Sequence, residues 1–198
     1  MKIYAVLTAI VLTGCTTLNY SSMDFHVEGD RIIANGVIDG GTLKRFMDVA
    51  GDNPHARTLV LQSVGGSVDD EANLIFSQAI HDAGFTTIVP SNGMVASGGT
   101  DLFLAGQRRI LEPGACVGVH SWSGGNVEGK DVPRDNPEHQ KYLRYYDAVG
   151  IDRDFYWYTL DAASAEDIHW MTADEANRYG MATQSATQLA RGDVCDDR

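Results

Sequence analysis

The sequence predicts an α/β domain in which buried strands alternate with helices, and three observations support this. Residues 58–62 form a continuous apolar run, typical of a strand covered on both faces of a parallel sheet. A helical pattern begins after the glycine pair at 65–66, and another apolar run follows at 85–89. This order of strand, helix and strand favours right-handed crossovers within one layered domain.

The chain before the first buried strand predicts two strands and a helix. Residues 25–38 contain two short β-like runs, and Glu-Gly-Asp at 28–30 is a turn signal between them. A helix is expected over 42–50. Four apolar residues there share one helical face: Leu43, Phe46, Met47 and Ala50.

The helix after the glycine pair has clear start and stop signals. Ser67 is the expected N-cap, and the acidic residues 69–71 suit the positive end of the helix dipole. Gly84 is the expected stop. The apolar stripe predicted for this helix consists of Ala72, Ile75, Phe76, Ala79 and Ile80.

The middle of the chain continues the alternation of helix and strand. Residues 102–105 read as a helix and residues 109–111 as a short strand. Residues 121–136 are rich in glycine and charge and show no apolar period, so we expect a loop.

The last third of the chain predicts helices. Residues 137–149 form one, and residues 172–180 begin with a Thr-x-x-Glu capping box and end on glycine. Between and within them lies an aromatic cluster of Tyr142, Tyr145, Tyr146, Phe155, Tyr156, Trp157 and Tyr158. We expect this cluster to pack in the core or between subunits, and an exposed binding interface is the alternative.

Composition excludes several functional classes. The 198 residues are enough for one domain, and the formal net charge of −12 argues against binding to a nucleic-acid backbone. No His-Glu-x-x-His motif occurs, so neither a metal nor another cofactor is expected. Five histidines stand singly and suit surface or packing roles: His26, His55, His81, His139 and His169.

The N-terminus predicts export. Residues 1–14 read as a signal peptide whose apolar run, 3–12, is too short for a permanent membrane span. The segment 12–15 is similar to the lipobox of bacterial lipoproteins, which implies cleavage before Cys15 and lipid attachment to it. Thr16 after that cysteine favours the outer membrane, at its periplasmic face. An ordinary signal peptide with a chance cysteine is the alternative.

The exported part is expected to hold one domain between two polar segments. Residues 15–23 form a tether, residues 24–190 the domain, and residues 191–198 an acidic tail. Because exported proteins meet disulfide-forming conditions, Cys116 and Cys195 are a possible pair that would tie the tail to the domain. A buried free Cys116 and a mobile Cys195 are the alternative.

The candidate chemistry lies at three strand ends. Ser97 lies among small residues in the segment 94–100, between an apolar strand and a helix, and His120 ends the apolar run 115–120. The strand at 58–62 runs into Gly65 and Gly66. A serine, a histidine and a glycine-rich backbone, each at a strand end, are the parts of a nucleophilic hydrolase.

These segments, in this order, resemble the Clp protease proteolytic subunit of the ClpP/crotonase superfamily over residues 30–184. The resemblance implies a layered α/β fold of repeated ββα units with a C-terminal helical region, and a serine peptidase activity. It rests on four short segments, which are Ser63–Val68, Ala96–Gly98 with Leu102–Gly106, Gly118–His120, and Ala173–Gly180.

The resemblance implies roles for five residues. Ser97 would be the nucleophile and His120 its general base, with the amides of Gly66 and Gly98 as the oxyanion hole. The family's acid falls on Ile168, and a one-residue shift would make Asp167 the carboxylate that orients His120.

Two departures from the family pattern leave questions open. Asp161 and Asp174 are alternatives for the acid, and Val64 replaces the family's proline. The family also implies a homo-oligomer, but an exported protein has no ATP supply, so an ATP-driven unfoldase partner is not expected. Peptides or unfolded proteins are the expected substrates.

Two rival functions are weighed against the peptidase. Acyl-CoA chemistry, as in the crotonase branch, would need a CoA supply that export removes. An inactive ClpP-like envelope binding or assembly module is the stronger alternative, and it would not need a carboxylate at Asp167.

Overall fold

The structure is a computed structural model that describes residues 20–198. The expected signal peptide, the lipobox and Cys15 lie outside these residues. Among residues 20–198, no helix combines the length and the apolar character needed to cross a membrane.

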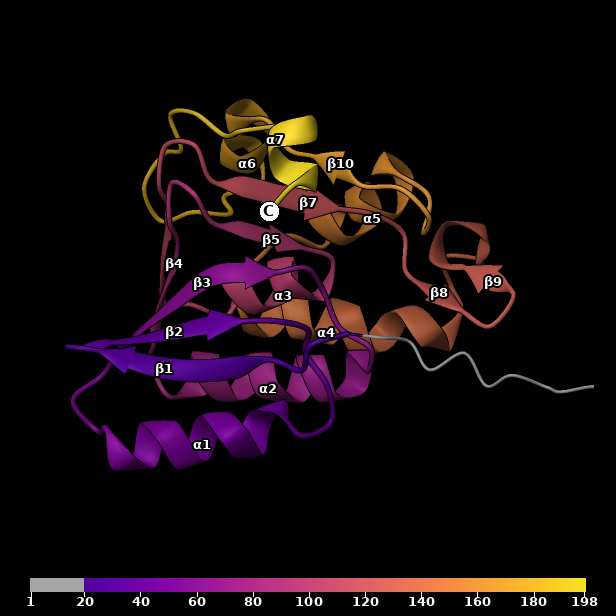
Figure 1. Ribbon diagram of the computed structural model, residues 1–198. Coiled ribbons are helices and arrows are strands. Elements are labelled where there is room, and N and C mark those ends of the chain that lie inside the picture. Colours follow the sequence, from indigo (N-terminus) through magenta and orange to yellow (C-terminus); the bar gives the residue numbers. More distant parts are fainter. Residues whose placement is uncertain (1–19) are drawn as a thin grey trace, which may run out of the picture.

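The centre of the molecule is an eight-stranded sheet (Figure 1). The main strand order is β1-β2-β3-β5-β7-β10, while β4 branches from β3 and pairs in turn with β6. The bounds are β1 Asp24–Glu28, β2 Arg31–Asn35, β3 Thr58–Val64, β4 Thr86–Val89, β5 Met94–Ala96, β6 Arg108–Leu111, β7 Cys116–Val119 and β10 His169–Trp170. The predicted strands are confirmed, and β10 is an addition.

The long strand β3 explains the branch point. Its first residues, 58–60, pair with β4, whereas Ser63 and Val64 pair with β5. Within this sheet, the pairs formed among strands β2 to β7 are all parallel, and β1 and β10 pair antiparallel with β2 and β7. The carboxyl ends of β3, β5 and β7 therefore meet on one edge, which is where ligands bind in parallel α/β sheets.

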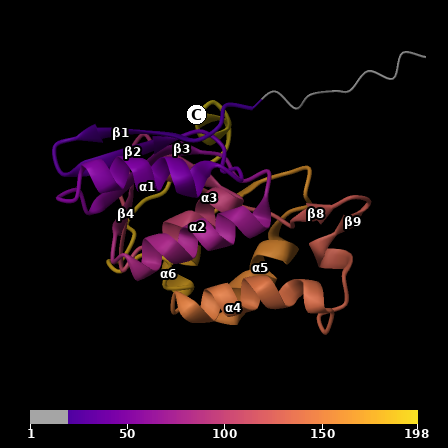
Figure 2. The same ribbon diagram turned by 90° about the horizontal axis from the view of Figure 1, so that it is seen from below.

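The helices form two layers on one side of the sheet. Figure 2 shows α1, α2 and α3 next to the sheet, and α4 and α5 beyond them. The bounds are α1 Thr42–Asp52, α2 Asp70–Asp82, α3 Gly98–Leu104, α4 Gln140–Ala148, α5 Arg153–Ala162 and α6 Ala173–Arg178. This mixed α/β architecture with a central sheet is the predicted fold class, and the capping box at α6 is also confirmed.

Two details of the helices differ from the prediction. Asp69, not Ser67, caps α2, because Ser67 still lies in extended backbone bridged to Ile38. The predicted apolar faces are also partly wrong, since Met47 and Ile75 are 60% and 53% exposed. On α2, buried Asn73 and Ser77 take part of the inner face, where they hydrogen-bond to one another.

The predicted loop 121–136 is more ordered than its composition suggests. It contains a two-stranded hairpin, β8 Ser123–Gly124 and β9 Val127–Glu128, followed by a 3-10 turn at Gly129–Asp131. A Cβ on Gly129 would lie 2.6 Å from the Trp122 ring, so this turn packs directly on that indole.

The aromatic cluster packs inside the protein. Five of its members are at most 5% exposed, namely Tyr142, Tyr145, Tyr146, Phe155 and Tyr156. The rings of Tyr142 and Tyr156 stack at 5.2 Å, and this contact joins α4 to α5. The cluster is therefore a core feature rather than an exposed interface.

The acidic tail folds back over the sheet. It contains the short helix α7, Asp193–Asp196, which lies in front of β7 in Figure 1. A disulfide joins Cys116 to Cys195, and the Arg198 guanidinium donates to the carbonyl oxygens of Gly93 and Gly114. These contacts hold the tail on the face of the sheet opposite the helices.

Candidate active site

Ser97 has the most unusual backbone of the described residues. It stands between β5 and α3 with φ 52°, ψ −129°, and it is the only described non-glycine residue at positive φ. Such a conformation costs about 1–3 kcal/mol in a residue with a side chain, and it persists only where the surroundings impose it. A strained turn that presents a serine at a helix N-terminus is the geometry of a nucleophile.

Close packing imposes this turn. The Ser97 amide and the Thr100 hydroxyl both donate to the Gly118 carbonyl oxygen, at 3.1 and 2.8 Å, which ties the turn to β7. A Cβ on Gly99 would lie 2.1 Å from the Val64 carbonyl oxygen. Gly99 therefore lets α3 approach β3. This contact holds the Ser97 turn on the side opposite β7.

Gly66 and Gly98 bring backbone amides to the Ser97 hydroxyl. A Cβ on Gly66 would lie 3.5 Å from Ser97 Oγ, and Gly98 directly follows the serine. Within residues 20–198, neither amide donates a hydrogen bond to another group. Two free N–H groups beside a serine oxygen are suited to stabilising an oxyanion, as predicted for these glycines.

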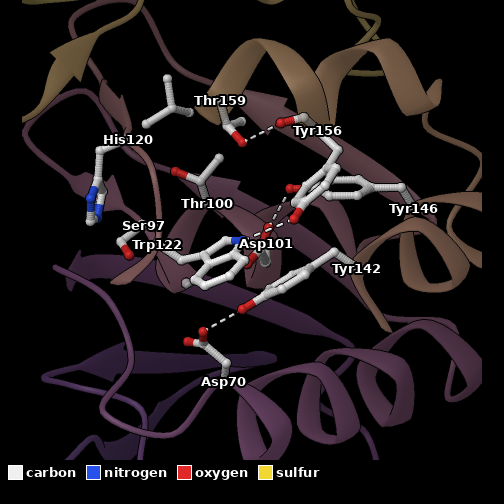
Figure 3. A pocket seen from close by; sticks show the side chains of 12 residues that line it. Asp70, Ser97, Thr100, Asp101, His120, Trp122, Tyr142, Tyr146, Tyr156 and Thr159 are labelled. Carbon is white, nitrogen blue, oxygen red and sulfur yellow. Dashed lines mark hydrogen bonds between the residues drawn. The ribbon is translucent and has the colours of Figure 1, made fainter. Parts of the chain in front are cut away.

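His120 follows β7 and lines the same cavity as Ser97. Figure 3 shows the two side chains next to one another at one side of this cavity. No hydrogen bond joins the two side chains, and the buried Nδ1 of His120 is without a partner among the described residues. Burial lowers the pKa of His120, which keeps the imidazole neutral and able to accept a proton.

The predicted orienting acid is not in contact with His120. The Asp167 carboxylate accepts the amide N–H of Ile168, and the residue is exposed, so the predicted hydrogen bond between Asp167 and His120 is absent. The two alternative acids do not hydrogen-bond to His120 either. Asp161 accepts from the Arg134 guanidinium, and Asp174 lies in the first turn of α6. The turn before β10 directs Asp167 to solvent, and Asp161 on α5 and Asp174 on α6 are exposed as well.

The structure instead places two unpredicted carboxylates in the cavity, those of Asp70 and Asp101. Asp70 accepts hydrogen bonds from the hydroxyls of Ser67 and Tyr142, at 2.8 and 2.5 Å. Asp101 accepts one from Tyr146 at 2.6 Å, and desolvation raises its pKa to about 7. Asp70 begins α2, and Asp101 lies in the first turn of α3. An acidic residue at such a place suits the helix dipole, so the sequence offered no reason to expect Asp70 in a site.

The cavity has a volume of about 40 Å³ and lies between the strand ends and the aromatic cluster (Figure 3). Trp122 closes one side, where its indole N–H donates to the Tyr156 hydroxyl at 2.8 Å. The indole also stacks on Tyr142 at 6.0 Å. Among the described residues, no group of three or more His, Cys, Asp or Glu side chains is arranged to hold a metal ion.

No protein-family model matches this sequence, and no curated protein matches it either. Solved structures with similar folds include the 1510-N membrane-bound stomatin-specific protease, as a mutant in complex with a substrate peptide. Its identity is 16%, its coverage 80% of this chain and 75% of that chain, and its TM-score 0.46.

Enoyl-CoA hydratases are also among the similar folds. One from Polaromonas is 13% identical, covering 89% of this chain and 74% of that chain with a TM-score of 0.49. An enoyl-CoA hydratase/isomerase from Cupriavidus metallidurans is 16% identical, covering 92% and 72% with a TM-score of 0.44. These solved structures share only 13–16% identity with this chain, so its chemistry must be argued from its own site.

Proposed function

We propose that this protein is a serine-type peptidase in which Ser97 is the nucleophile and His120 the general base. The observation that carries the proposal is the strained turn at Ser97, φ 52°, which opens on a cavity shared with His120. A protein that needed only a small residue there would gain stability from glycine, so the retained side chain argues for a chemical role.

The proposed reaction is acyl transfer in two steps. His120 takes the proton of the Ser97 hydroxyl as the oxygen attacks a peptide carbonyl, and the amides of Gly66 and Gly98 receive the negative charge. The imidazolium then gives its proton to the leaving amine, and water hydrolyses the acyl-enzyme by the reverse proton path. The lowered pKa of His120 makes the neutral base available at neutral pH.

A fluorophosphonate probe tests the nucleophile without knowledge of the substrate. We expect the wild-type protein to be labelled and Ser97→Ala to remain unlabelled. Ser123→Ala is the matched control, because Ser123 is an exposed serine on the neighbouring hairpin, and this variant should label like wild type. Labelling of Ser97→Ala at the wild-type rate would refute the role of Ser97.

One observation favours a second candidate, an inactive ClpP-like binding module in the cell envelope. The buried Nδ1 of His120 has no partner in residues 20–198, and Asp167 does not reach it. A working triad requires a carboxylate at that nitrogen. Absence of labelling in every variant, with intact folding, would favour the binding module.

We further propose that the protein acts at the periplasmic face of the outer membrane, anchored through lipid on Cys15. The lipobox-like segment 12–15 supports this proposal. Metabolic labelling with a fatty-acid analogue should mark the wild-type protein but not Cys15→Ser. A homo-oligomer, without an ATP-driven unfoldase, is the assembly we expect, and sedimentation of the purified protein would measure it.

A further inference from the structure

The cavity beside Ser97 is lined by two carboxyl groups that the fold does not pair with a cation. Asp70 and Asp101 both line it, and within residues 20–198 neither carboxylate forms an ion pair with a Lys, Arg or His side chain. The hydrogen bonds that they receive come from neutral groups, chiefly the hydroxyls of Ser67, Tyr142 and Tyr146. Carboxylates removed from water without a positive partner are costly for the folded state.

The surroundings of the two carboxylates strengthen any interaction with a cation. Tyr142, Tyr146, Tyr156 and Trp122 line the cavity and make much of its wall aromatic. A cation close to a carboxylate is attracted more strongly in such surroundings than in water, because the effective dielectric constant is lower. The aromatic wall therefore makes the site selective for charge and not only for size.

Two features besides the carboxylates point to a ligand at this place. The cavity opens directly at Ser97, where the side chain next to a scissile bond would enter. The buried Nδ1 of His120, on the same wall, also has no partner in the described part of the chain. Buried polar atoms without partners are uncommon in folded proteins, and they mark places where a ligand or water completes the site.

The volume of the cavity selects among cations. About 40 Å³ is room for a few water molecules, because each needs about 10–15 Å³ on this measure. An ammonium group is about as large as one water, so it can enter with its hydrogen bonds satisfied. A guanidinium is broader and planar, so it suits this small volume less well.

We propose that this cavity is a specificity pocket for a lysine side chain of the substrate, with Asp70 as the residue that recognises the ammonium group. This inference rests on the proposed peptidase function and names its substrate class. The pocket binds the residue whose carbonyl is attacked by Ser97. Asp101 keeps its proton up to about pH 7 and adds charge only above that pH. The hydroxyls of Tyr142 and Tyr146 position the two carboxyl groups.

The test compares two peptidyl phosphonate probes that differ only in lysine against norleucine at the residue next to the phosphonate. Norleucine has the same chain length and lacks the charge, so the ratio of the two inactivation rates isolates the ammonium group. We expect the wild-type protein to react at least tenfold faster with the lysine probe. Asp70→Asn keeps the shape of the side chain, and it should bring the ratio close to one.

Fluorophosphonate labelling, which needs no side-chain recognition, runs in parallel and separates the two proposals. If the protein labels at Ser97 but reacts equally with both probes, or faster with norleucine, the lysine pocket is refuted and the peptidase proposal stands. If Ser97 does not label, the peptidase proposal fails. Should Asp70→Asn not fold, as judged by circular dichroism, Asp101→Asn serves as the second variant and should lower the ratio at pH 8.

Discussion

Replacing Asp101 with Asn should stabilise the protein, and more so at high pH. In the folded protein the carboxyl of Asp101 keeps its proton up to about pH 7, because desolvation and the charge of Asp70 raise its pKa. In the unfolded chain it loses the proton near pH 3.8. The folded state therefore binds more protons between these values, so its stability falls as the pH rises from about 4 to about 7.

The expected size follows from the two pKa values of Asp101. The difference between 3.8 and about 7 corresponds to about 4 kcal/mol at pH 8. Because Asp101 is only half-buried, water screens part of this cost, and we expect Asp101→Asn to raise the free energy of unfolding by about 2–3 kcal/mol. The amide can still accept from the Tyr146 hydroxyl, while the 3.4 Å contact with Asn73 is a smaller loss.

Urea denaturation of wild type and variant at pH 5 and pH 8 measures this effect. The gain should be largest at pH 8 and should shrink towards pH 5. Asp147→Asn is a control of opposite sign, because hydrogen bonds from the Arg153 guanidinium lower the pKa of Asp147. That variant should lose stability at pH 8. A stability gain for Asp101→Asn that is equal at both pH values would refute the reasoning.

Three further predictions concern the strain, the base and the tail. Ser97→Gly should abolish fluorophosphonate labelling yet raise the free energy of unfolding above that of Ser97→Ala by about 1 kcal/mol, because glycine tolerates φ 52°; equal stability of the two variants would contradict strain at this turn. The rate of labelling should rise with pH around an apparent pKa below 6.5, because burial disfavours the charged form of His120, and a midpoint above 6.5 would contradict this. Cys195→Ser should lower the free energy of unfolding by about 4 kcal/mol through loss of the link to Cys116, 79 residues away. Urea denaturation checks it, and unchanged stability would show that the tail does not contribute.

The candidate nucleophile and base were predictable because their signals are local. Ser97 and His120 each stand at the end of an apolar strand. The glycines at 66 and 98 indicate places where a substrate backbone can approach closely. Parallel strands bring such ends to one edge, so the sequence was enough to expect them together. The strand-and-helix order was predictable for the same reason, since periodicity along the chain reports burial directly.

The acidic side of the cavity was not predictable from the sequence. Asp70 and Asp101 stand 31 positions apart at the starts of two helices, where an acidic residue already has a sufficient explanation in the helix dipole. Only the packing of α2 against α3, under the tyrosines of α4, brings both carboxylates into one cavity. Asp167 shows the converse, because its place in the sequence suited a triad acid while the local turn directs it to solvent.

The sequence by itself determined the α/β class, the order of most elements and the three strand ends that carry Ser97, His120 and Gly66. Only the tertiary structure decided the strain at Ser97, the unpaired imidazole nitrogen and the charge of the cavity. The physical reason is that hydrophobic periodicity is written along the chain, whereas φ strain, desolvation and charge pairing arise from contacts between segments that are distant in sequence.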